Sequence, residues 1–219
     1  MNIHPLPNVT YRGKGYDMGV FMSKQLCLRP FRDLCLASWE ERKPLNMDED
    51  NVASQYKDTE GWTIHRKRAW TALMCGAHYD YIDFSIINYC ETGTEESRHC
   101  IRAWIGHLSH FIHSFDLASS RPLQGRIHGL PEFVCESVFG VPGADYAVYL
   151  ADARELGSPG AGDPIQFEMQ FEVPPGKYQM AAFSPTIGQS SPWIPTTSEG
   201  SINVTTPIFE HDLTIRVRV

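Results

Sequence analysis

The chain has 219 residues, of which 42% are apolar and 11% aromatic, so it can bury a large core and is not expected to be disordered. Its formal net charge is −7 and it has no basic stripe, which argues against nucleic acid and anionic membranes as partners. No apolar run approaches the roughly 20 residues of a membrane helix. The first ten residues, MNIHPLPNVT, lack the charged leader and apolar segment of a signal peptide, so we expect a cytoplasmic protein.

The first part of the chain predicts strands that alternate with helices. A short strand could end at His4, and residues 11–19 read as a loop. A helix over 31–41 should end at Lys43-Pro44, because the residue before a proline disfavours the helical conformation. A strand over 44–47 then leads into three consecutive carboxylates, Asp48, Glu49 and Asp50.

Two further helices and a strand follow before residue 122. Asp58 or Thr59 could cap a helix whose apolar residues recur near a period of about 3.6. A mostly buried strand is expected over 79–87, and an unbroken apolar stripe predicts a long helix over 97–115.

After about residue 122 the helical periodicity disappears and short alternating runs separated by turns begin. Residues 213–219, LTIRVRV, alternate apolar and polar side chains as half-buried antiparallel strands do, and VPPGKY at 173–178 reads as a tight turn. We therefore divide the chain into 1–122 and 123–219. Six strands are expected in the second part, over 133–138, 146–150, 165–173, 178–183, 201–205 and 213–219.

Motifs for cofactors or metals are not found. There is no GxGxxG, Walker or HExxH sequence, so no cofactor and no metal are expected. His107, His110 and His113 recur every three residues, but they lie off the apolar stripe and indicate a solvated helix face. The six cysteines have no CxxC spacing, which favours buried free thiols over disulfides or a zinc site.

Several segments, in this order, resemble the C-terminal part of certain glycoside hydrolases. These enzymes have a (β/α)8 barrel of the large retaining clan followed by a β-sandwich, and the resemblance is to the apiosidase-like families and their relatives. The matching segments are KPLNMDE at 43–49, RAWTALMCGA at 68–77, YAVYL at 146–150, VPPGKY at 173–178 and LTIRVRV at 213–219.

The resemblance implies a partial β/α barrel of about three units over 1–122 and an antiparallel β-sandwich over 123–219. It also implies a glycoside hydrolase acting on O-glycosidic bonds of polysaccharides, or a protein descended from one, with carbohydrate as its partner. Glu49 matches the catalytic-site glutamate of these families and is the candidate nucleophile.

The chain also departs from the family pattern. A whole barrel needs about 250 residues, and the acid/base of such families normally follows the fourth strand, which this chain does not contain. The possible second carboxylates are Asp48, Asp50, Asp80, Asp83 and Glu91. Asp80 and Asp83 are three residues apart, so they face opposite ways on a regular strand, and only one of them could point into a site shared with Glu49. A solvated acidic loop, or an inherited site without its partner, is the competing interpretation.

The remaining candidate site residues lie around the same strand ends. Asp48 and Asp50 flank Glu49, while aromatic and imidazole rings could form a sugar-stacking platform or belong to the core. These rings are Trp62, His78, Tyr79 and Tyr81.

An alternative function follows from the missing part of the barrel. The chain could be a non-catalytic carbohydrate-binding or interaction protein whose barrel is completed by self-association or by another chain. A partial barrel leaves an open edge on a parallel sheet, so we expect a homo-oligomer.

Overall fold

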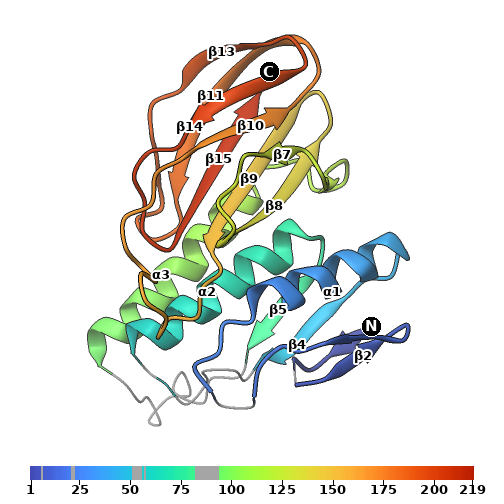
Figure 1. Ribbon diagram of the computed structural model, residues 1–219, viewed down its shortest axis with the longest axis vertical. Coiled ribbons are helices and arrows are strands. Elements are labelled where there is room, and N and C mark those ends of the chain that lie inside the picture. The colour runs from blue at the N-terminus through green and yellow to red at the C-terminus, as the bar shows by residue number, and fades with distance from the viewer. Residues whose placement is uncertain (6, 21–22, 51–55, 57, 82–93) are drawn as a thin grey trace.

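The computed structural model describes residues 1–5, 7–20, 23–50, 56, 58–81 and 94–219 (Figure 1). Within these residues the chain forms three helices and fifteen strands. The helices are α1 (Leu28–Glu40), α2 (Thr59–Met74) and α3 (Glu95–Ile112). The strands of the first part are β1 (Asn2–Ile3), β2 (Val9–Tyr11), β3 (Lys14–Tyr16), β4 (Asn46–Asp50) and β5 (His78–Tyr81). The strands from residue 121 onward are β6 (Arg121–Pro122), β7 (Ile127–His128), β8 (Val134–Val141), β9 (Asp145–Asp152), β10 (Glu168–Glu172), β11 (Gly176–Ser184), β12 (Gln189–Ser190), β13 (Ile194–Ser198), β14 (Ser201–Thr205) and β15 (Asp212–Arg218).

The elements stack in layers. A parallel sheet of order β1-β4-β5 lies on one side of the helices. On the other side lies a larger antiparallel sheet, whose order is β12-β11-β15-β9-β8-β6 with β13 beside β11. A smaller antiparallel sheet of order β14-β10-β7 covers the far face of the larger one. In Figure 1 the helices cross the middle of the molecule, with the antiparallel sheets above them and β4 and β5 below.

Helix α2 is the central element. Asp58 caps its N-terminus by accepting a hydrogen bond from the Gly61 backbone N–H at 2.8 Å, as the sequence predicts. Nearly all of its side chains are buried, because it has the parallel sheet on one side and the larger antiparallel sheet on the other. Trp70 shows this position, since its ring stacks on Tyr149 of β9 at 5.4 Å between centroids.

The larger antiparallel sheet contributes its two faces to different cores. Cys135, Phe139 and Tyr149 face the helices. Their neighbours Val138 and Val148 face the smaller sheet. This alternation follows from the period of two along a strand and leaves little of β8, β9 and β15 exposed.

The coarse expectations for the fold are confirmed, because the chain is mixed α/β with its helices in the first part and antiparallel strands in the second. Strand 201–205 and the long helix are found, although α3 spans Glu95–Ile112 rather than 97–115. The expected strand over 79–87 is β5 as far as Tyr81, and its remainder lies outside the described residues.

Three expectations need correction. The strand predicted over 44–47 is β4 at Asn46–Asp50, so it begins two residues later and contains the acidic residues. The loop predicted over 11–19 contains half of the β2–β3 hairpin. The turn predicted over 173–178 is shorter, because β11 begins at Gly176; it connects β10 of the smaller sheet to β11 of the larger one.

Two further findings concern the cysteines and the helices. Cys27, Cys35, Cys75, Cys100 and Cys135 are free thiols, while Cys90 lies outside the described residues. Burial raises the pKa of the Cys75 thiol to about 12, so it stays protonated at neutral pH. Among the described helices, none combines the length and the apolar composition of a membrane span.

Candidate functional site

The carboxyl ends of β1 and β4 bring three ionisable side chains together. Because the two strands are parallel, His4, which follows β1, lies beside the acidic end of β4. Its Nδ1 atom is 3.6 Å from a carboxylate oxygen of Glu49, and its Nε2 atom is 3.9 Å from one of Asp48. Glu49 is half exposed, at 49%, so its carboxylate can meet a molecule from solution. His4 is not among the residues that the sequence singles out, because a single histidine after a short strand has no distinguishing pattern.

A β-bulge lies at this end of β4. Met47 pairs with Tyr79 and Asp50 pairs with Tyr81, so two residues on β4, Asp48 and Glu49, stand against one on β5. Glu49 has a φ of 52°, a left-handed conformation that non-glycine residues adopt at a cost. Bulges of this kind redirect side chains and are frequent beside active sites.

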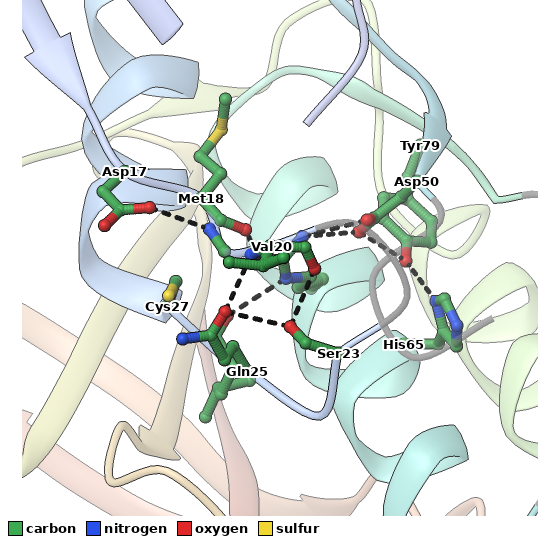
Figure 2. A network of polar contacts seen from close by, with 12 residues as sticks. Asp17, Met18, Val20, Ser23, Gln25, Cys27, Asp50, His65 and Tyr79 are labelled. Carbon is green, nitrogen blue, oxygen red and sulfur yellow. Dashed lines mark hydrogen bonds and ion pairs between the residues drawn. The ribbon is translucent and has the colours of Figure 1, made fainter. Parts of the chain in front are cut away.

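Asp50 does not face solvent with the other two acids. Its side chain is fully buried, and both carboxylate oxygens accept from Nη1 of Arg68 on α2 at 2.9 Å. The hydroxyl of Tyr79 donates to Asp50 Oδ2 at 3.0 Å and lies 2.8 Å from Nδ1 of His65 (Figure 2). Because the Tyr79 proton goes to Asp50, we assign the proton of this contact to His65 Nδ1.

Arg68 also holds the loop that connects β3 to α1. Its Nε donates to the Leu26 carbonyl at 3.0 Å and its Nη2 to the Met18 carbonyl at 2.5 Å. The loop has hydrogen bonds of its own, including one at 2.7 Å from the Val20 backbone N–H to the Gln25 side chain (Figure 2). One buried guanidinium thus joins the end of β4 to a loop far away in the sequence.

The other candidate residues differ in burial. Trp62 is fully buried with Ile101 and Trp104, so it offers no stacking surface to a sugar. His78 and Asp80 are exposed on β5 and line a mostly apolar groove of about 570 Å³ beside α3. Tyr81 ends β5, and Asp83 and Glu91 lie outside the described residues.

The histidines of α3 have different surroundings. Nδ1 of His107 lies 3.0 Å from the Pro185 carbonyl oxygen, whereas His110 and His113 are exposed. Among the described residues no group of three or more His, Cys, Asp or Glu side chains is placed to hold a metal ion.

Chemically, the end of β4 offers one exposed carboxylate beside an imidazole, supported by a second carboxylate that is buried and neutralised. Such a group can act as a nucleophile or as a general base toward a bound molecule. Asp48, which is 25% exposed and accepts from the Asn46 side chain at 3.1 Å, can accept hydrogen bonds from the same molecule.

Comparison with solved structures relates the chain to glycoside hydrolases. It is similar over 99% of its length to a glycoside hydrolase family 5 protein from Bacteroides vulgatus, with a TM-score of 0.59, 14% identity and 50% of that chain covered. It also matches a family 44 endoglucanase from Clostridium acetobutylium, with a TM-score of 0.44, 10% identity, 100% of this chain and 46% of that chain. A family 44 xyloglucanase from Paenibacillus polymyxa gives a TM-score of 0.44 and 10% identity, over 99% of this chain and 46% of that one.

The likeness to the family 5 structure, at a TM-score of 0.59 and 14% identity, is one of fold. The chain therefore has a glycoside hydrolase-like fold and spans about half the length of the family 5 structure. No protein-family model matches the sequence, and no curated protein matches it.

Proposed function

We propose that the chain forms part of a glycoside hydrolase that cleaves O-glycosidic bonds of polysaccharides, with Glu49 as its nucleophile. The observation that carries the proposal is the exposed Glu49 carboxylate at the carboxyl end of a parallel strand, 3.6 Å from His4. Catalytic residues of β/α barrels come from these strand ends. The family 5 likeness and the segments that resemble the retaining clan support the same function.

In this proposal Glu49 acts by double displacement. A carboxylate oxygen attacks the anomeric carbon, the bond to the leaving-group oxygen breaks, and a general acid gives that oxygen a proton. Water then attacks the same carbon, the former acid accepts its proton, and the Glu49 carboxylate leaves. His4 is placed to orient Glu49, and Asp48 to bind a sugar hydroxyl.

The second carboxylate should lie about 5–5.5 Å from Glu49 in a retaining enzyme. Asp80 on β5 lies opposite the bulge and is the candidate second carboxylate among the described residues. Asp83 and Glu91, which lie outside them, are the other candidates in this chain. A carboxylate from another polypeptide is the third source, because the chain spans only about half of the family 5 structure.

We further propose that the parallel sheet is part of a β/α barrel and that the antiparallel sheets form a β-sandwich beside it. In the described residues β1 and β5 end the parallel sheet, so each has one edge without a neighbouring strand. Strands β1 and β5 run in the same direction. If two copies faced each other around a two-fold axis parallel to the strands, β5 of each copy would lie beside β1 of the other. We therefore propose a homo-oligomer in which copies complete each other's sheets.

The nucleophile is tested with an aryl glycoside and Glu49→Gln. The matched control is Glu172→Gln, because Glu172 is also about half exposed, at 51%, and pairs with His128 at 2.8 Å in the antiparallel part. We expect Glu49→Gln to abolish cleavage and Glu172→Gln to leave it unchanged. Activity that survives in Glu49→Gln would exclude Glu49 as the nucleophile.

Azide gives a second, mechanistic test. In Glu49→Ala, azide should restore cleavage by attacking the anomeric carbon from the face that the carboxylate has left, giving a glycosyl azide of inverted configuration. A product of retained configuration would assign Glu49 to the acid/base role instead. Saccharide binding without any cleavage by the unmodified protein would favour a non-catalytic carbohydrate-binding protein.

A further inference from the structure

The two faces of the parallel sheet differ at β4. Met47 of β4 is buried against α1 and α2, as is Leu45 just before the strand, so these odd-numbered residues face the helices. Asn46 and Asp48 face the opposite way, and their side chains contact each other. In a regular strand, residues two apart share a face. Glu49 would therefore follow Met47 and point into the helix layer.

The bulge changes which side chain faces the helices. Two residues of β4 stand against one of β5 there, so Asp50 takes the position facing the helices and Glu49 becomes exposed. The change also places Glu49 at a φ of 52°, which is unfavourable for a glutamate. Some interaction must compensate for this cost, and it must distinguish Asp50 from the neighbouring Glu49.

Arg68 supplies that interaction. Its guanidinium is fully buried, and a buried cation needs an anionic partner at short range. Four of its hydrogen bonds are fixed, two to Asp50 and two to the carbonyls of Met18 and Leu26. Because these carbonyls and helix α2 hold the guanidinium in place, the carboxylate has to come to it.

We infer that Arg68 is a positioning residue that, by binding Asp50, holds the bulge in β4 and so presents Glu49 to solvent at the carboxyl end of the sheet. Tyr79 and His65 form a second support, because the Tyr79 hydroxyl bonds the same carboxylate. The inference rests on the proposed function only where it treats Glu49 as the group that reacts.

The test replaces the pair with apolar residues of similar size, as Arg68→Met with Asp50→Leu. The matched control is Arg66→Met with Asp212→Leu, which removes another buried ion pair of the same helix that does not touch β4. In isotopically labelled protein, a strong intraresidue NOE between the amide and α protons and the Cα shift of Glu49 report its positive φ. These signals do not depend on activity.

We expect the positive-φ signature of Glu49 to be lost in the Arg68/Asp50 variant and kept in the Arg66/Asp212 control. On an aryl glycoside, the first variant should lose about 100-fold in kcat with KM nearly unchanged, because a displacement near 1 Å has an effect of this size. A signature kept in both variants would overturn the inference, as would one lost in both.

If the Arg68/Asp50 variant fails to fold, Asp50→Asn provides the second test. It keeps the shape of the side chain but weakens its bond to Arg68, so Glu49 should show a second set of signals from the unbulged strand. A single unchanged set would overturn the inference. If the unmodified protein cleaves no glycoside, the proposed function fails, and the NMR result still decides whether Arg68 positions Glu49.

Discussion

Arg66 and Asp212 form a buried ion pair that joins helix α2 to strand β15. Nε and Nη2 of the guanidinium donate to the two carboxylate oxygens at 3.0 and 2.8 Å, and the side chains are 1% and 0% exposed. The Tyr149 hydroxyl also donates to Asp212 at 3.0 Å, and the guanidinium lies over the Trp104 ring at 4.1 Å. The pair therefore connects the helix layer to the larger antiparallel sheet.

Removing one member of this pair should be much more damaging than removing both. Arg66→Met alone leaves a buried carboxylate uncompensated, so we expect the free energy of unfolding to fall by about 3–5 kcal/mol. Arg66→Met with Asp212→Leu should recover most of this loss, because no buried charge is left. Urea unfolding of both variants measures the difference, and a double variant as unstable as the single one would contradict the prediction.

Because Lys67 is buried, the stability of the protein should depend on pH in the alkaline range. Burial lowers the pKa of its ammonium from 10.5 to about 8 in the folded protein. Between these values the unfolded chain holds the proton and the folded chain does not, so this group makes the protein more stable as pH rises from about 8 to 10.5. The contribution is on the order of 3 kcal/mol.

Lys67→Met should flatten this rise in stability, measured by urea unfolding at several pH values. The control is Lys177→Met, because Lys177 is exposed on β11 and should leave the slope as in the unmodified protein. The variants are compared by the slope of the free energy of unfolding against pH. The free energy itself also changes, because Lys67→Met loses the hydrogen bond from Lys67 to the Asp152 carbonyl at 2.8 Å. Equal slopes in the Lys67 variant and its control would exclude Lys67 as the source.

The positive φ of Glu49 should lower the stability of the protein, although the residue belongs to the proposed site. Glycine adopts a φ of 52° without the steric cost that a side chain brings, so Glu49→Gly should raise the free energy of unfolding by about 1 kcal/mol. Glu49→Ala keeps the Cβ atom and should remain close to the unmodified protein. Thermal unfolding of the two variants tests this, and an equal effect of alanine and glycine would argue against a strained backbone at this position.

Substitutions at two glycines of the β8–β9 hairpin distinguish the cost of a steric clash from the cost of a positive φ. A Cβ atom at Gly140 would lie 2.1 Å from the Asp145 carbonyl oxygen, whereas one at Gly143, which also has a positive φ, would meet nothing within 4 Å. Gly143→Ala should therefore destabilise by about 1 kcal/mol, and Gly140→Ala by clearly more, in the same unfolding assay. Similar losses in both would mean that the hairpin relaxes around the clash.

The sequence predicts the elements whose signals are local. The Asp58 cap follows from residue type, and the buried stripe of α3 follows from apolar spacing. Strand β10 has the expected alternation of buried and exposed residues. In β15 the alternation is lost: Thr214 is buried along with Leu213 and Ile215, because helices cover the face on which the polar side chain lies.

The rest depends on partners far away in the sequence. Arg66, Lys67 and Arg68 are charged side chains in the middle of α2, yet each is buried and bonds a different acid or carbonyl, because layers lie on both sides of α2. The same limit applies to the site. No pattern in Asp48–Asp50 indicates which acid is buried, since that depends on Arg68.

The position of α2 bears on how the chain unfolds. Because α2 is buried by the parallel sheet on one side and by the larger antiparallel sheet on the other, neither sheet can detach without exposing apolar side chains of α2 to water. Detaching a sheet would also break the hydrogen bonds of Arg66 and Lys67, or those from Arg68 to Asp50. We expect the chain to lose its structure in a single cooperative transition, even though its composition changes at residue 122.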